Sequence, residues 1–383
     1  MSAPLGGAFT RTASNGANAS TRPPQLSHQQ LSAFPSLNRN RLSGPPSQLA
    51  RPTAAVLQAE APAHRRETPE NAWPSHSQNG AAKESDFTTG QLLHGRTAFQ
   101  EEHKIRSYEC GPDQATTVFT ISNLLQEVAG NHGVALWGRT ASGFATDPIM
   151  VEMDLIFVST RIQVQMDRYP RWGDRVQIET WFQAEGRLAA CRNWLIRDAS
   201  TGEMLGRATS SWVMLNTKTR KLSKIPTKMR EKLNYLAPNP HRDSLDPSLT
   251  RKKISEVSLP AEIIGPQQVA RRSDMDMNGH INNVTYLGWA LETIPEGMAS
   301  DYTLHQVEID FKSECLAGDT VESLGSRLQE ETNGEGVVRY LHLVRCCKDG
   351  DCRELVRARS TWRPNHVQPE HLHPWLPGQG DAQ

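Results

Sequence analysis

The spacing of apolar residues predicts a helix near the start of the folded part of the chain. Four apolar residues recur at intervals of three and four, which places them on one helical face: Ile121, Leu124, Leu125 and Val128. Thr120 or Ser122 is suited to cap the start of this helix, because a hydroxyl oxygen can accept a free backbone N–H. Beyond it, apolar and polar residues alternate over short stretches, which predicts β-strands. These stretches include residues 162–166, 176–180 and 210–214.

The second half of the folded part repeats this order. A helix is predicted over residues 283–293, with Pro295 after its end. Strands are predicted at residues 307–311, 321–324, 337–345 and 355–362. The tetrapeptide Gly-Asp-x-Val precedes a strand in both halves, at residues 173–176 and 318–321. One helix followed by antiparallel strands, twice, indicates an α+β fold in which a sheet wraps a helix in each repeat.

Composition separates this folded part from the ends of the chain. Residues 1–59 contain five Arg, eight Ser and seven Pro, but no Lys and no acidic residue. This composition predicts a transit peptide at residues 1–60, with an untargeted tail as the alternative. Polar, proline-rich stretches predict a disordered linker at 61–94, a second linker at 234–260 and a disordered tail at 365–383. The two folded halves are then residues 95–233 and 261–364.

Charge and cysteine content narrow the function classes. The chain of 383 residues has 42 basic and 42 acidic residues, which disfavours a strongly basic nucleic-acid-binding surface. No apolar stretch approaches the ~18 residues of a membrane-spanning helix, which excludes an integral membrane protein. The six cysteines are too irregularly spaced for a disulfide scaffold and include no CxxC pair, so a reducing compartment and no structural metal are expected. For Cys346, Cys347 and Cys352 we expect packing or an exposed turn rather than a redox role.

One short segment concentrates polar chemistry. Asp276, Asn278 and His280 alternate just before the second predicted helix, so an extended backbone would point them to one side. A carboxylate, an amide and an imidazole can together orient a substrate, polarise a carbonyl and move a proton. The structural alternative is that Asp276 and Asn278 form turn hydrogen bonds while Asn282 caps the helix. A metal site is disfavoured because the segment supplies only one His and one Asp as ligands.

Residues 272–295, RSDMDMNGHINNVTYLGWALETIP, resemble the signature of the plant and algal plastid acyl-acyl-carrier-protein thioesterases. Residues 206–209, Met277 and Thr285 to Tyr286 favour the oleoyl-preferring branch. Gly279 and Ser313 depart from the family, which usually has Gln and Arg at these positions. The resemblance covers roughly residues 95–363 and continues in IRSYE at 105–109, NLLQE at 123–127, RYPRWGD at 168–174, WLIRD at 194–198, GRAT at 206–209, WVMLN at 212–216 and SEC at 313–315.

The resemblance implies a tandem hotdog, with two antiparallel sheets each wrapping a central helix. It places the family's functional positions on Asp276, Asn278, His280 and Glu314, with Cys315 as the alternative nucleophile. The first half has no such motif, so we expect an acyl pocket there and one catalytic site, in the second half. A glutamate that acts as a base near neutral pH needs a raised pKa, which burial would provide.

The implied reaction is hydrolysis of a fatty acyl-acyl-carrier-protein thioester to free fatty acid and carrier thiol, without a cofactor, in the plastid stroma. The implied partner is acyl carrier protein, and a homodimer is a possible assembly of the chain. Competing hypotheses are a hotdog dehydratase for 3-hydroxyacyl thioesters and a non-catalytic acyl-binding protein. A basic run at 217–232 suggests a docking surface for an acidic carrier, formed by Lys218, Arg220, Lys221 and Lys224. A solvated charged face is the equally weighted alternative for this run.

Overall fold

The computed structural model describes residues 89–139, 146–328, 336–348 and 350–365. The predicted transit peptide, residues 61–88 of the predicted linker and the tail from residue 366 lie outside this part of the chain. The last residues of the predicted disordered linker are ordered, because Gln91–Leu93 forms strand β1 and pairs with β2, Ala98–Lys104. The predicted linker therefore extends too far toward the C-terminus.

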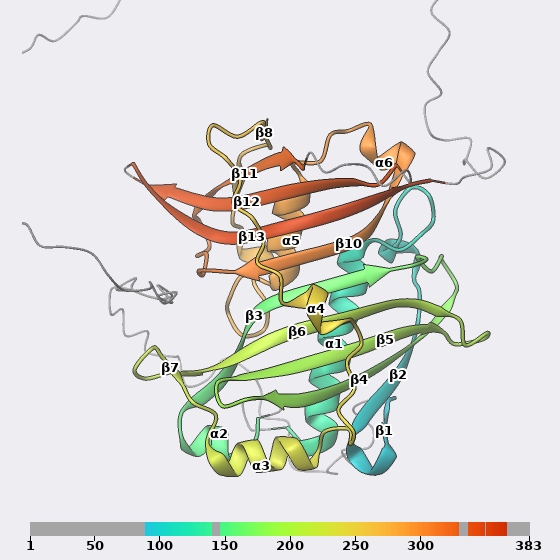
Figure 1. The fold of residues 1–383 in the computed structure, drawn as a ribbon, viewed down its shortest axis with the longest axis vertical. Coiled ribbons are helices and arrows are strands. Elements are labelled where there is room, and N and C mark those ends of the chain that lie inside the picture. Colours follow the sequence, from blue (N-terminus) through green and yellow to red (C-terminus); the bar gives the residue numbers. More distant parts are fainter. Residues whose placement is uncertain (1–88, 140–145, 329–335, 349, 366–383) are drawn as a thin grey trace, which may run out of the picture. The chain divides into compact units, whose positions relative to one another are not determined.

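Within the described residues, thirteen antiparallel strands form one sheet (Figure 1). The N-terminal half contributes the order β1-β2-β4-β5-β6-β3, and the C-terminal half continues it as β10-β13-β12-β11-β8. The short strands β7 and β9 pair with β6 and β11. The bounds not yet given are β3 Leu155–Met166, β4 Arg175–Glu185, β5 Ala189–Asp198, β6 Met204–Asn216, β7 Lys221–Ser223, β8 Ile263–Ile264, β9 Gln268–Val269, β10 Tyr302–Phe311, β11 Thr320–Arg327, β12 Val338–Lys348 and β13 Asp351–Pro364.

The two half-sheets join through the pairing of β3 with β10. Gln165 lies opposite Gln306, and Ile162 lies opposite Ile309. The strand order is mirrored on either side of this seam, since β4-β5-β6-β3 in the first half corresponds to β11-β12-β13-β10 in the second. The tandem hotdog is therefore confirmed, with its two sheets continuous rather than separate.

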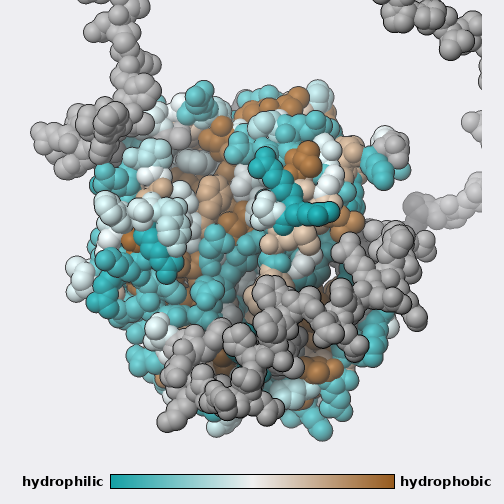
Figure 2. Space-filling view, turned by 180° about the vertical axis from the view of Figure 1, so that it is seen from behind, coloured by the Kyte–Doolittle hydropathy of each residue, from teal (hydrophilic) through white to brown (hydrophobic). Residues whose placement is uncertain are grey.

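Two helices, one from each half, pack on the inner face of the sheet and contact each other. They are α1, Val118–Trp137, and α5, Asn283–Leu291. Ile121, Leu125 and Val128 of α1 are buried against strands of both halves, as the apolar spacing predicted. No helix in the described ranges is both long enough and apolar enough to cross a membrane. Seen from behind, the described surface mixes apolar and polar residues (Figure 2).

The start of α1 corrects the predicted cap. Thr117 is the N-cap, and its hydroxyl oxygen accepts the backbone N–H of Thr120 at 3.2 Å. Thr120 and Ser122 lie inside the helix, where the Thr120 hydroxyl donates to the carbonyl of Glu109. The apolar pattern marks the buried face and not the first turn, so it placed the helix start too late. Asn282 caps α5 by accepting the N–H of Val284, as one of the sequence alternatives predicted.

The repeated Gly-Asp-x-Val tetrapeptides form the same turn in both halves. Gly173 has a φ of 91° and Gly318 a φ of 99°, a backbone region that glycine enters without steric cost. The N–H of Gly173 donates to the carbonyl of Ile105, and that of Gly318 donates to the carbonyl of Ala270. In each half, this hydrogen bond therefore ties the turn to the segment that leads to the helix.

Residues 234–260, predicted as a linker, pack over the outer face of the N-terminal half-sheet (Figure 1). Trp181 of β4 donates from its indole N–H to the carbonyl of Arg242, and Ser244 donates to the carbonyl of Ala208. Ile254 is fully buried. The segment contains the short helix α4, Pro247–Thr250, and follows α3, Thr227–Tyr235; the other short helices are α2, Pro148–Glu152, and α6, Met298–Asp301.

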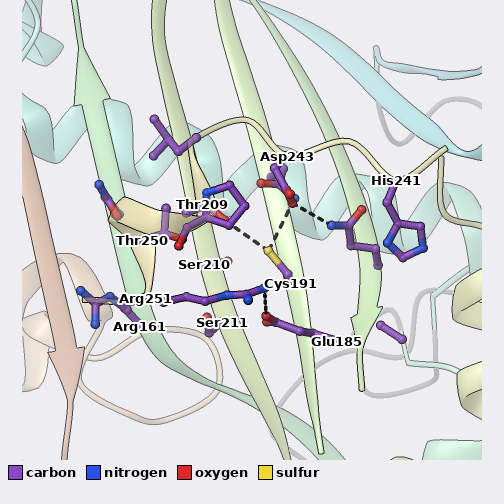
Figure 3. Close-up of a pocket in the computed structure, with 16 residues that line it drawn as sticks. Arg161, Glu185, Cys191, Thr209, Ser210, Ser211, His241, Asp243, Thr250 and Arg251 are labelled. Carbon is purple, nitrogen blue, oxygen red and sulfur yellow. Dashed lines mark hydrogen bonds and ion pairs between the residues drawn. The ribbon is translucent and has the colours of Figure 1, made fainter. Parts of the chain in front are cut away.

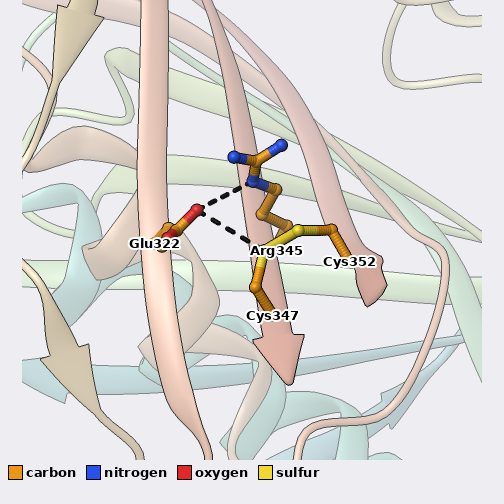
Figure 4. Close-up of a disulfide and its surroundings, with 4 residues drawn as sticks. All are labelled: Glu322, Arg345, Cys347 and Cys352. Atoms are coloured by element: carbon orange, nitrogen blue, oxygen red, sulfur yellow. Dashed lines mark hydrogen bonds and ion pairs between the residues drawn. A yellow bond between two sulfur atoms is a disulfide. The ribbon is translucent and has the colours of Figure 1, made fainter. Parts of the chain in front are cut away.

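A disulfide joins Cys347 to Cys352 at the end of the β12–β13 hairpin (Figure 4). The two residues lie directly opposite each other in the strand register. Beside them, Arg345 donates to the carboxylate of Glu322 at 2.9 Å. The disulfide differs from the expectation that Cys347 and Cys352 only pack or lie in an exposed turn. They meet because the β12–β13 register, which the sequence did not specify, places them opposite each other.

Candidate active site

The segment Asp276 to His280 forms a tight turn and not the extended backbone that the alternation suggested. Met275 and Ile281 pair as an isolated bridge, and the N–H of Asp276 donates to the carbonyl of His280. Gly279 lies inside the turn with a φ of 78°, a conformation that suits glycine. The three polar side chains are therefore presented by a closed loop just before α5.

Asp276 organises this loop. One of its carboxylate oxygens accepts the backbone N–H groups of Asn278 and His280, at 2.9 and 3.2 Å. The other accepts the side-chain amide of Asn278 at 3.0 Å. The turn hydrogen bonds of the structural alternative are thus present, and they fix the position of the residue that carries the imidazole.

Glu314 meets His280 across the site. It lies in the loop after β10, and its Oε1 is 3.4 Å from Nε2 of His280. The side chain of Glu314 is 28% exposed and that of His280 is 49% exposed. Glu314 is therefore only partly buried. The pair is open to solvent, so a water molecule can reach both groups.

Cys315 has different surroundings from its neighbour. Its side chain is buried, and burial raises the pKa of the thiol to about 12. Its Sγ faces the carboxylate of Asp319 and the carbonyl of Leu316, and its backbone N–H donates to the hydroxyl of Tyr286. Glu314 and Cys315 thus point to different partners, and the carboxylate is the one that faces His280.

Two residues to which the sequence analysis gave no role in the site hold the Glu314 loop. Arg353 on β13 donates to the main-chain carbonyl of Glu314 and pairs with Asp319 at 3.6 Å. Tyr286 on α5 accepts the N–H of Cys315 at 2.9 Å. Tyr286 lies within the family-like segment, whereas Arg353 is 39 residues beyond Glu314 in a strand with no local signal. Only the pairing of β10 with β13 brings Arg353 to the site.

The four basic residues predicted to dock a carrier divide into two kinds. Lys218 pairs with Asp154 at 2.7 Å, and Arg220 pairs with Glu314 Oε2 at 3.3 Å. Lys221 and Lys224 are exposed, and their side chains make no ion pair within the described part of the chain. Because Arg220 contacts Glu314, the part of the basic run around Arg220 lies at the edge of the candidate site.

The first half contains the same loop framework without counterparts of His280 and Glu314. Cys110 and Thr116 form the isolated bridge that corresponds to Met275 and Ile281. Between them, Gly111, Asp113 and Ala115 occupy the places of Asp276, Asn278 and His280. Glu314 lies four residues before Gly318 of the repeated turn. The residue four positions before Gly173, the equivalent glycine of the first half, is Tyr169. The described residues therefore assemble this constellation in the C-terminal half, as the sequence predicted.

A separate pocket lies between the outer face of the sheet and residues 241–251 (Figure 3). It has a volume of about 160 Å³ and is lined by polar side chains that include Cys191, Thr209 and Asp243. The buried side-chain oxygens of Gln163 and Gln183 have no hydrogen-bond partner there. Such a polar cavity suits ordered water molecules. It contains none of the predicted site residues.

Comparisons with known proteins agree with this architecture. The family model described as the acyl-ACP thioesterase N-terminal domain matches residues 96–233, and the C-terminal domain model matches residues 262–364. The chain is 39% identical to the chloroplastic oleoyl-acyl carrier protein thioesterase 1 of Arabidopsis thaliana, over 72% of this chain and 78% of that protein. It is 38% identical to the chloroplastic palmitoyl-acyl carrier protein thioesterase of Gossypium hirsutum, over 74% of this chain and 68% of that protein.

A solved structure supports the same assignment. The 12:0-ACP thioesterase from Umbellularia californica superposes with a TM-score of 0.63 and 32% identity, over 70% of this chain and 94% of that chain. The similarity thus extends over both halves of the tandem fold, and it includes the oleoyl branch that the sequence motifs indicated. The chain belongs to the acyl-ACP thioesterase family.

Proposed function

We propose that Asp276, Asn278, His280 and Glu314 carry out the reaction that this family membership entails, the hydrolysis of a fatty acyl-ACP thioester. Glu314 takes a proton from water, whose oxygen adds to the thioester carbonyl carbon. The carbon–sulfur bond then breaks, and His280 takes that proton from Glu314, 3.4 Å away, and passes it to the leaving thiolate. The products are free fatty acid and carrier thiol, and no cofactor is needed for this balance.

The other two residues hold the reacting groups. Asp276 fixes the loop through the backbone N–H groups of Asn278 and His280. The amide of Asn278 is exposed and restrained by Asp276, so it is available to hold the thioester carbonyl. Proper orientation of this kind lowers the barrier without forming a covalent intermediate. Attack by the carboxylate itself is the alternative role for Glu314.

The observation that carries the proposal is the 3.4 Å approach of Glu314 to His280 on an ordered loop. Glu314→Ala, His280→Ala and Asp276→Ala should each lower kcat by at least about a hundredfold, the low end for a general acid–base group. The measurement is kcat on one carrier-linked substrate, with folding checked by circular dichroism. Variants that remain folded and keep wild-type kcat would remove these residues from the mechanism.

The sequence leaves two other functions as alternatives, a hotdog dehydratase and a non-catalytic acyl-binding protein. A dehydratase would release an enoyl thioester, and a binding protein would release nothing. The named relatives are hydrolases and thioesterases, which does not favour either alternative. Product analysis separates the three, because only hydrolysis yields free thiol and free fatty acid together.

We further propose where and with what partner the protein works. The relatives are named chloroplastic, which supports a plastid location, and the acid-free N-terminal segment is typical of a transit peptide. Within the plastid we place the enzyme in the stroma. The acyl chain would lie along α1 in the N-terminal half. Homodimer formation stays a prediction, which sedimentation equilibrium of the purified protein can test.

A further inference from the structure

Arg220 reaches the candidate base from the other half of the molecule. Its guanidinium Nη2 is 3.3 Å from Oε2 of Glu314, while Oε1 of the same carboxylate faces His280 at 3.4 Å. The two oxygens of Glu314 are thus divided between a fixed cation and the imidazole. Because Arg is always charged and bonds through a rigid planar group, it can restrain the rotation of a carboxylate.

The backbone presents Arg220 in a conformation that is unusual for its residue type. Its φ is 57°, in the left-handed region, which side chains other than glycine, asparagine and aspartate rarely adopt. The turn after β6 enforces this conformation, since Asn216 accepts the N–H of Thr219 with its side chain and the N–H of Arg220 with its carbonyl. Four other non-glycine residues of the described chain also have a positive φ, so this conformation describes how the turn closes and is not by itself a sign of function.

The ion pair between Arg220 and Glu314 contributes little to the stability of the fold. The side chain of Arg220 is 49% exposed, and exposed ion pairs contribute little to folding. The reason to assign Arg220 a role in the site is its contact with the carboxylate that faces His280. Within the described residues, the other charged or titratable groups around Glu314 are His280 on the loop before α5, Tyr286 on α5, and Arg353 on β13 with its partner Asp319.

We propose that Arg220 is a positioning residue that holds the carboxylate of Glu314 toward His280, rather than part of the carrier-docking surface. Arg353 fixes the main chain of Glu314, and Arg220 fixes its side chain. The N-terminal half thereby completes the site of the C-terminal half. This inference rests on the proposed role of Glu314 as the base.

Three substitutions separate positioning from docking. Arg220→Gln removes the charge, Arg220→Lys keeps it, and Arg220→Gly also relieves the left-handed backbone. Lys228→Gln is the matched control, because Lys228 is an exposed cation in the same basic run. The assays measure kcat and KM on carrier-linked and coenzyme A-linked substrates, and the melting temperature.

We expect Arg220→Gln and Arg220→Gly to lower kcat at least about tenfold on both substrates, because a misplaced catalytic group loses rate whatever carries the acyl chain. Arg220→Lys should recover part of this loss. Arg220→Gly should melt no lower than wild type.

A docking role would give a different pattern. A salt-dependent rise in KM for the carrier substrate alone, with kcat unchanged, would overturn the proposal. Glu314→Gln separates failure of the proposed function from failure of the positioning role alone. If it keeps wild-type activity, the proposed function itself fails. If it is inactive while Arg220→Gln behaves like Lys228→Gln, only the positioning role fails. Adding Arg220→Gln to Glu314→Gln should cause no further loss, because both act on one group.

Discussion

Glu314 and Cys315 are adjacent in the chain, but their side chains face different surroundings. Glu314 is partly exposed between His280 and Arg220. Cys315 is buried beside Asp319, and burial holds the pKa of its thiol near 12. A nucleophilic cysteine must be a thiolate, which needs a lowered pKa and a nearby cation or imidazole. Arg353 is near Cys315, but burial and the carboxylate of Asp319 outweigh it and raise the pKa of the thiol, so Cys315 does not meet these requirements.

Replacement of Cys315 by alanine should therefore leave most of the activity. We expect kcat within about tenfold of wild type, or ~1.4 kcal/mol of activation free energy, with the loss caused by a small cavity and not by missing chemistry. Iodoacetamide at pH 8 should not alkylate Cys315 in the folded protein, which mass spectrometry of the digested protein can check. The same treatment in denaturant is the control. An inactive but folded Cys315→Ala beside an active Glu314→Ala would restore the cysteine mechanism.

At the scale of elements, His342 joins three parts of the C-terminal half. It lies on β12, with Nδ1 at 2.7 Å from the hydroxyl of Thr293 and Nε2 at 2.8 Å from the hydroxyl of Ser360. The Thr293 hydroxyl donates to the carbonyl of Ala290, so Nδ1–H of His342 donates to Thr293 and Nε2 accepts from Ser360. The neutral ring thus connects the end of α5 to β13. Burial lowers the pKa of His342 to about 3.

This neutral, buried histidine predicts a loss of stability in acid. An unfolded histidine binds a proton near pH 6.5, whereas His342 in the folded chain does so only near pH 3. Its contribution is fully present above pH 6.5 and falls as the pH is lowered toward 3, by up to ~1.4 kcal/mol per pH unit. Urea unfolding at pH 5 and pH 7.5 measures this difference.

The variant His342→Gln supplies the comparison for this pH effect. It should be less stable than wild type at pH 7.5 by about 1–3 kcal/mol, because buried hydroxyls lose a partner. Its stability should depend less on pH between 5 and 7.5. Some dependence should remain, because burial also lowers the pKa of His132 and of His305. An unchanged slope in the variant would contradict the assignment of the effect to His342.

Periodicity predicted which elements exist, but not how they begin or meet. The apolar faces of α1 and α5 follow directly from spacing, since burial selects every third or fourth residue. The cap at Thr117 and the turn at Asp276 depend on hydrogen bonds that alternation does not encode. The contacts of Arg220 and Arg353 with Glu314 depend on long-range pairing of strands. The sequence could therefore locate the acid–base motif, while the groups that hold it came only from the fold.

At the scale of the whole described body, the two halves share one seam and divide the chemistry. Glu308 on β10 is buried at the seam and pairs with Arg161 on β3 and Arg359 on β13. Removing one partner of such a buried network is costly, so it favours a fixed alignment of the two halves. A fixed alignment is what Arg220 needs to reach Glu314 from the other half. The N-terminal half thus takes part in the site although its own loop lacks the acid–base residues.

The predicted carrier-docking surface also belongs to this scale. The ion pairs of its four basic residues show which of them can be replaced without disturbing other contacts. Lys218 pairs with Asp154 and Arg220 pairs with Glu314, so their removal would disturb more than docking. Lys221, which follows Arg220 in the chain, and Lys224 are exposed and have no ion pair within the described residues. These two lysines are therefore the cleaner test of whether the basic run attracts an acidic carrier or is a solvated face.

Replacing both Lys221 and Lys224 with alanine should raise KM for carrier-linked substrate about three- to tenfold and leave kcat near wild type, because complementary charge acts mainly on the encounter rate. KM for the coenzyme A-linked substrate should rise less, since it lacks the acidic protein surface. Raising salt from 50 to about 300 mM should reproduce the effect in wild type and change the double variant little, because salt screens exposed charges. Lys104→Ala, an exposed lysine at the end of β2, is the control for general loss of charge. Equal changes on both substrates, without a salt effect, would leave these lysines as part of a solvated face.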